Sequence, residues 1–123
     1  MTDQYVVMII AVELHREWPM ENLLLNLSMS PDRWERDFMA RQRDALGQTR
    51  ARLDAVDVRA CFKLAHWKLR SGTQAMGVGL DMILDHQDEE GKSVVAAGFA
   101  HVLEGQEAAQ TAADTCGYAR PPK

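Results

Sequence analysis

The sequence predicts a single all-α domain, a compact bundle of five to six helices. Apolar residues recur at three- and four-residue steps along most of the chain, which is the spacing of an amphipathic helix. Helix-start signals precede several of these stretches. A chain of 123 residues makes one domain, which we place at residues 1–116, with residues 117–123 as a flexible tail.

The N-terminal stretch admits two interpretations. Its β-branched residues between Val6 and Val12 suit a buried strand. The apolar spacing, however, continues at helical steps to Trp18 and ends before a proline. We favour a helix over residues 3–17 and keep an α+β fold, with residues 5–14 as a strand, as the alternative.

Two helix-start signals define the next elements. Pro19 suits the first position of a short helix. In the stretch Ser30-Pro31-Asp32, a serine N-cap precedes a proline at the first helical position and an acid that suits the positive helix end. Because apolar residues continue from there at helical spacing, we predict a long central helix over about residues 31–55.

The rest of the chain predicts three more helices. Asp57 can cap the first, which Ser71 and Gly72 would close, Thr73 begins the second, and Ser93 caps the last. The last two resemble each other at an offset of 19 residues, and we expect them to pack as a C-terminal helical hairpin. Small residues that would let them approach closely are Gly77, Gly79, Ala96, Ala97 and Gly98.

Composition and cysteine content predict a cytoplasmic protein. A hydrophobic fraction of 46% with 26% charged residues excludes wholesale disorder. Cys61 and Cys116 form no metal-binding motif and are too few for a disulfide scaffold, which favours a reducing compartment. A Cys61–Cys116 bridge is the alternative. The apolar run at residues 5–12 lacks the flanks of a signal peptide and is too short to span a bilayer, so we expect no membrane contact.

Charge is unevenly distributed along the chain. The net charge is −4 over residues 1–32, +5 over 33–70 and −5 over 71–123, for a total of −4. Arg36, Arg43 and Arg50 are seven residues apart, which places them on one helix face. This arginine face is either a solvated surface, complemented by the chain's own acidic segment at residues 81–90, or a surface that recognises anions.

Catalysis and metal binding find little support in the sequence. The histidines lack the spacing of ligands in a helical metal site. The chain contains no nucleophile, paired-carboxylate or dinucleotide motif. We therefore predict no catalytic residues, no metal and no cofactor. A metal-dependent enzyme is kept as an alternative, and its ligands would be His15, His66, His86 and His101.

The function that these observations favour is a small non-catalytic protein-binding module. It would act as an adaptor, regulator or inhibitor that docks on a larger protein or nucleoprotein complex. Trp, Met and Arg, the residue types enriched at interfaces, gather in the middle of the chain. Nucleic-acid binding through the same arginines is an alternative, less favoured because the isoelectric point is about 5.5. A homodimer through helix 3–17 is another. The predicted partner-binding residues are Arg33, Trp34, Arg36, Arg43, Arg50 and Trp67.

Overall fold

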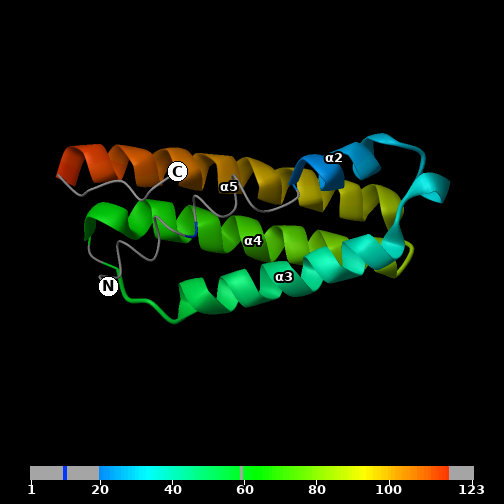
Figure 1. The fold of residues 1–123 in the computed structure, drawn as a ribbon, viewed down its shortest axis with the longest axis horizontal. Helices are drawn as coiled ribbons and strands as arrows, with labels where there is room; N and C mark the ends of the chain where they lie inside the picture. The colour runs from blue at the N-terminus through cyan, green and yellow to red at the C-terminus, as the bar shows by residue number, and fades with distance from the viewer. Residues whose placement is uncertain (1–9, 11–19, 59, 117–123) are drawn as a thin grey trace.

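The computed structural model describes residues 10, 20–58 and 60–116, which form an elongated helical bundle (Figure 1). Within these residues there are four α-helices and no strand. Helices α3, α4 and α5 run lengthwise, each antiparallel to the next (Figure 1). The α-helices are α2 (Met20–Ser28), α3 (Arg36–Asp54), α4 (Lys63–Leu84) and α5 (Asp88–Cys116), with 3-10 turns η1 (Pro31–Arg33) and η2 (Ala60–Phe62) between them.

The all-α class is confirmed for the described residues, but these residues contain four α-helices and do not support the count of five to six. The stretches predicted as two helices on either side of Ser71 and Gly72 form one helix, α4. Gly72 lies inside α4, and its lack of a side chain serves the close contact with the backbone of α5 and does not end the helix. The strand alternative at residues 5–14 gains no support, since Ile10 is helical and buried and the rest of that segment lies outside the described residues. The predicted tail at 117–123 also lies outside them.

The predicted long central helix begins later than the sequence indicated. Pro31–Arg33 is a separate 3-10 turn, and Ser30 before it makes no side-chain cap hydrogen bond. Trp34 then adopts an extended backbone, and its Nε1 donates to the Met29 carbonyl oxygen at 3.1 Å. The break turns the Trp34 indole into the core, where 7% of the residue is exposed. Helix α3 therefore starts at Arg36 and is shorter than α4 and α5.

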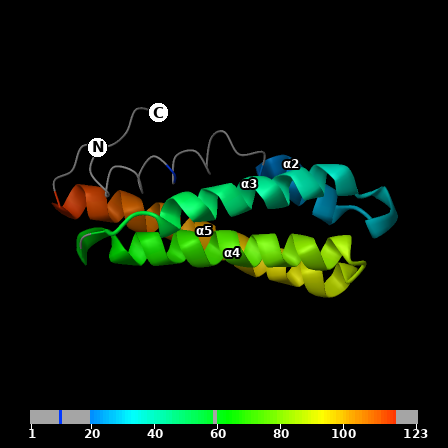
Figure 2. The ribbon, with the colours of Figure 1, turned by 90° about the horizontal axis from the view of Figure 1, so that it is seen from below.

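The core lies on one side of the α4–α5 hairpin. In Figure 2, α2 and α3 lie above α4 and α5, and no described element lies below the hairpin. Helix α3 packs along α4, and α4 packs along α5. The largest fully buried side chains are Ile10, Leu23, Met39, Leu46, Leu53, Phe62, Leu69, Met76, Leu80 and Ile83.

Glycines at seven-residue spacing bring α4 and α5 into backbone contact. Gly72 faces Gly98, and Gly79 faces Gly91. A Cβ atom added at any of these four residues would lie 2.6–2.9 Å from backbone atoms of the opposite helix. Gly105 continues the α5 series and faces Leu69 in the same way. Seven-residue spacing keeps such residues on one helix face, so the glycines form a continuous seam between the two helices.

The predicted helical hairpin is therefore present, although only part of its predicted contact is right. Gly79 and Gly98 lie in the seam as expected. Gly77 does not, because a Cβ added there would meet no atom within 4 Å, and Ala96 and Ala97 are exposed. The turn between the helices passes through His86, whose φ of 64° is in the left-handed region.

Candidate interaction surface

Arg36 is fixed by contacts within the chain. Its Nη1 donates to the Ile83 carbonyl oxygen at 2.7 Å, and its two terminal nitrogens donate to the Asp88 carboxylate at 3.2 Å. The guanidinium also lies 5.7 Å from the centre of the Trp34 ring. The side chains of Arg36 and Asp88 are 30% and 25% exposed. Arg36 thus ties the start of α3 to the turn between α4 and α5.

The next arginines along α3 also pair with acids of the same chain. Arg43 donates to Asp81 at 3.0 Å and pairs with Asp44 at 3.2 Å, and these two carboxylates raise the pKa of Arg43. Arg50 lies 3.6 Å from Asp54, which also pairs with Arg70. The arginine face is complemented by the chain's own acids, two of which (Asp81 and Asp88) belong to the acidic segment singled out in the sequence.

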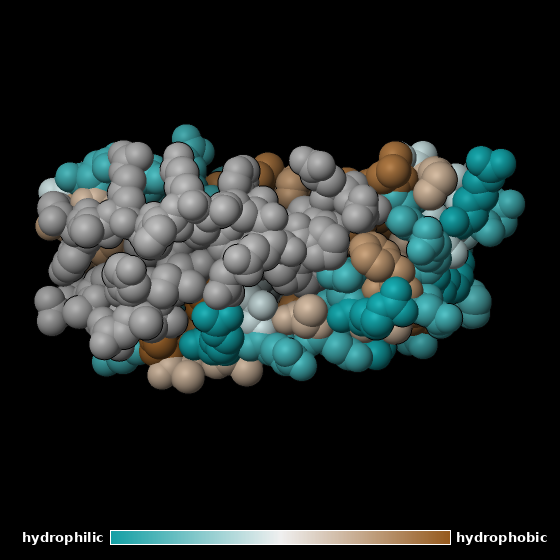
Figure 3. All heavy atoms as spheres, in the orientation of Figure 1, coloured by the Kyte–Doolittle hydropathy of each residue, from teal (hydrophilic) through white to brown (hydrophobic). Residues whose placement is uncertain are grey.

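The six predicted partner-binding residues do not form one patch. Arg33 is exposed, Trp34 is buried, and Arg36, Arg43 and Arg50 are engaged in the pairs described above. Trp67 is on α4 and 52% exposed. Figure 3 shows the face of the molecule on which α3 lies, where hydrophilic residues line the edge over that helix. A partner-binding role for the arginines stays a prediction.

We expect replacement of Arg36 by alanine to lower the free energy of unfolding by about 1.5 kcal/mol. Hydrogen bonds to charged groups contribute roughly 1.5–3 kcal/mol when buried, and partial exposure reduces this contribution. Arg41→Ala is the matched control, because Arg41 is exposed on the same helix and pairs with no described carboxylate; its effect should stay within about 0.5 kcal/mol. Urea unfolding measures both variants. Equal effects would contradict a structural role for Arg36.

The side of the hairpin away from α3 carries exposed apolar residues. Leu64, Trp67 and Val78 of α4 are 60%, 52% and 47% exposed, whereas Leu69 and Met76 on the other side of the helix are buried. On α5 this side carries Ala97 and Glu104, which are exposed, and His101 and Ala108, which are half-buried. No described element covers this side (Figure 2). We name it the outer face and define it by Leu64, Trp67, Lys68 and Val78 of α4 and Ala97, His101, Glu104 and Ala108 of α5.

Side-chain contacts across the outer face connect the two helices. Lys68 forms an ion pair with Glu104, and its ammonium lies 5.3 Å from the centre of the Trp67 ring. The Trp67 ring meets His101 edge to face, with the ring centres 6.1 Å apart. The hydrogen bond from Lys68 lowers the pKa of Glu104. These contacts hold the Trp67 side chain in place although half of its surface is exposed.

An open groove of about 480 Å³ lies at one end of the outer face. Lys68 and Glu104 compensate each other's charge in its wall. Glu107 is exposed and pairs with no cation in the part of the chain that the structure describes. Among the described residues, the groove therefore combines an apolar surface with the negative charge of Glu107, which no described cation compensates. Its lining residues are Cys61, Leu64, Lys68, Glu104, Glu107, Ala108, Thr111, Ala112 and Thr115.

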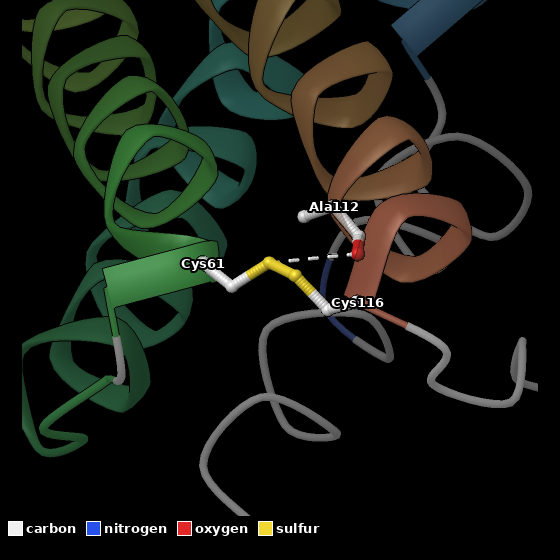
Figure 4. The surroundings of a disulfide bond; sticks show 3 residues. All are labelled: Cys61, Ala112 and Cys116. Carbon is white, nitrogen blue, oxygen red and sulfur yellow. Dashed lines mark hydrogen bonds between the residues drawn. A yellow bond between two sulfur atoms is a disulfide. The ribbon is translucent and has the colours of Figure 1, made fainter.

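A disulfide between Cys61 and Cys116 closes this end of the hairpin (Figure 4). Cys61 lies in η2, and Cys116 is the last residue of α5. Their Cα atoms are 6.8 Å apart, and the Cys61 sulfur lies 3.7 Å from the Ala112 carbonyl oxygen. The sequence left this bridge as an alternative, because two distant cysteines carry no signal of pairing until the fold brings them together.

The histidines do not gather in one place. His66 Nε2 lies 2.6 Å from the Leu53 carbonyl oxygen and donates to it at the end of α3. His86 lies in the α4–α5 turn, and His101 contacts Trp67; His15 lies outside the described residues. Among residues 10, 20–58 and 60–116, no group of three or more His, Cys, Asp or Glu side chains could hold a metal ion. In the same residues, no helix is long and apolar enough to cross a bilayer.

No protein-family model, curated protein or solved structure matches the chain. The functional argument therefore depends on the outer face itself. Sequence reasoning singled out Trp67 but not Leu64, Lys68 or Glu104. The seven-residue spacing of the glycines marks the side of each helix that contacts the other, and therefore also the side that stays exposed. This signal is visible only when Gly72 is assigned to a continuous helix.

Proposed function

We propose that the chain is a small protein-binding module, an adaptor, regulator or inhibitor, which docks on a larger protein or nucleoprotein complex through the outer face. The observation that carries this proposal is the exposure of Leu64 and Trp67 beside the groove. Neighbouring large apolar residues that are solvent-exposed mark interaction sites. Tryptophan in particular is enriched among the residues that dominate binding energy.

The arginine face is a weaker basis for docking than the outer face. Binding of an acidic partner by Arg36, Arg43 or Arg50 would compete with carboxylates that already hold these side chains. Arg33 and Arg41 are exposed and without a described carboxylate partner, so these two side chains can meet a partner's anion or a nucleic-acid backbone without breaking a described ion pair. This difference allows the two faces to be tested separately.

Affinity capture from a lysate of the source cells, with nuclease treatment and quantitative mass spectrometry, tests the proposal. The double variant Leu64→Glu/Trp67→Glu should lose a stoichiometric protein that the wild type captures. Arg33→Glu/Arg41→Glu changes two equally exposed positions and should retain it. Circular dichroism should be the same for all three proteins.

The reverse pattern, loss of the partner with the arginine variant alone, would overturn docking through the outer face. Loss of the partner after nuclease treatment would instead favour nucleic-acid binding, whose affinity falls steeply with salt. Retention of the partner by both variants would contradict both surfaces.

The cytoplasmic location stays a prediction, and the disulfide makes it testable. Disulfides persist in oxidising compartments and are rare in the cytosol. Alkylation of thiols at the moment of cell lysis distinguishes the two cases. A cytoplasmic protein should have both Cys61 and Cys116 alkylated, whereas a bridged protein from an oxidising compartment should have neither.

A further inference from the structure

We propose that the occupant of the outer face is one amphipathic helix of the partner protein, which lies in the groove beside Leu64 and Ala108 and places a lysine or arginine against Glu107. This inference depends on the proposed function and names the partner's chemistry. Three features carry it: the shape of the groove, the charge of the groove, and the contacts that hold Trp67 beside it.

The shape of the groove suits a helix. One side of the groove is formed by Cys61, Leu64 and Lys68 of η2 and α4 and the other by α5, and the close approach of Gly105 to Leu69 joins the two helices at one end of it. The groove follows α5 from Glu104 to Thr115, which is about 16 Å or three helical turns. The chain already packs one helix, α3, lengthwise on the opposite side of α4. Helix-in-groove recognition on the outer face would repeat this packing with a partner's helix.

The charge of the groove selects a basic helix. Lys68 is committed to Glu104, so it offers no cation to a partner. Glu107 projects from the next turn of α5 without a described cation beside it. Burying this carboxylate under a neutral or acidic helix would be costly, whereas a partner's lysine or arginine would compensate it. The remaining polar lining consists of the hydroxyls of Thr111 and Thr115, which tolerate either charge.

Trp67 provides an aromatic surface beside the groove, next to its lining residue Lys68. Its ring is held between the edge contact with His101 and the ammonium of Lys68. Because this side chain is already ordered, a partner that packs on it loses little conformational entropy on binding. Leu64, one turn earlier on the same helix, is 60% exposed and extends the apolar contact toward the disulfide. Together they match the apolar stripe of an amphipathic helix at its three- and four-residue spacing.

Two synthetic peptides test the inference. One is a sixteen-residue helix with leucine and alanine on one side and lysine on the other; the second replaces each lysine by glutamate. Titration of the full ¹⁵N-labelled chain should show the lysine peptide binding at least about tenfold more tightly, a difference of roughly 1.4 kcal/mol. The largest shifts should fall on Leu64, the Trp67 indole and Ala108.

Reversing the charge of one groove residue should reduce this preference. In Glu107→Lys the ratio of the two affinities should fall by at least about fivefold, because the groove then carries a positive charge. Glu89→Lys is the matched control: Glu89 is also exposed on α5, at the far end of the helix, and the same charge change there should leave the ratio as in the wild type. If the affinity ratio fell equally in both variants, the preference would depend on the net charge of the protein and not on Glu107, and the inference would be overturned.

Other outcomes also overturn it. No binding of the lysine peptide at millimolar concentration, or shifts centred on α3, would remove a basic helix from the outer face. Sedimentation equilibrium of the chain alone adds a further outcome: a dimer that Trp67→Glu abolishes would assign the face to a second copy. If neither peptide binds while capture of a cellular protein still requires Leu64 and Trp67, the further inference is wrong but the proposed function stands. The partner would then bind the outer face with something other than a basic helix.

Discussion

Replacing Gly98 by alanine should lower the free energy of unfolding by about 2 kcal/mol. A Cβ atom there would lie 2.7 Å from the Met76 backbone nitrogen and 2.8 Å from the Gly72 carbonyl oxygen. Backbone atoms cannot rotate away as a side chain can, so α4 and α5 must separate. Overpacking of a close contact costs roughly 1–3 kcal/mol, and a clash with backbone atoms belongs at the upper end of this range. The gain of about 1 kcal/mol from replacing glycine by alanine in a helix offsets only part of that cost.

Gly77→Ala is the matched control for this prediction. Gly77 lies in the interior of α4, two residues before Gly79 in the seam, yet a Cβ added there meets no atom within 4 Å. Only the helix-propensity gain remains, so this variant should be more stable than the wild type by about 0.5–1 kcal/mol. Urea unfolding followed by circular dichroism measures both changes.

Opposite signs for the two glycines are therefore expected from the same chemical substitution. The double variant Gly72→Ala/Gly98→Ala should cost less than the sum of the single changes, because the first substitution already separates the helices at that contact. If Gly98→Ala stabilised the protein as much as Gly77→Ala, the backbone contact between α4 and α5 would not exist in solution.

The helical class and the hairpin could be predicted from the sequence, because both depend on local signals. Apolar spacing and the offset of 19 residues between two similar segments are visible without any tertiary information. Helix ends could not be predicted in the same way. Gly72 after Ser71 has the pattern of a helix stop, but the same lack of a side chain also permits a close helix contact. Which of the two applies depends on the opposite helix.

The outer face could be predicted only in part, for a similar reason. Trp34 and Trp67 are equivalent by residue type, and sequence reasoning assigned both to binding. The structure buries Trp34 beneath the break before α3 and leaves Trp67 exposed. Arg36 and Arg43 are likewise typical of a binding surface until their acidic partners, which lie far along the chain, are brought beside them. Tertiary contacts decide whether such side chains are available.

Removing the disulfide should have a larger effect than any single change on the arginine face. Cys61 and Cys116 are separated by 55 residues, and closing a loop of this length removes enough unfolded-state entropy to stabilise the fold by about 3–4 kcal/mol. The double variant Cys61→Ser/Cys116→Ser should lose about 3 kcal/mol of unfolding free energy. Reduction of the wild type with a dithiol should give the same loss, which urea unfolding measures with and without the reductant.

Without the bridge, one end of the molecule should also open locally. Asp114, Thr115 and Cys116 form the last turn of α5 and are all exposed, and the bridge ties this turn to η2. Hydrogen exchange of the reduced protein should therefore accelerate most in this turn and in η2, which can then open locally. The amides along the glycine seam, which open only in global unfolding, should accelerate by no more than the loss of unfolding free energy predicts. The serine double variant is the control, since a dithiol should not change it further. If the wild type unfolded at the same urea concentration with and without reductant, the bridge would not form in solution, and the end of the groove beside Cys61 would depend on buried side chains such as Phe62, Ala112 and Ala113.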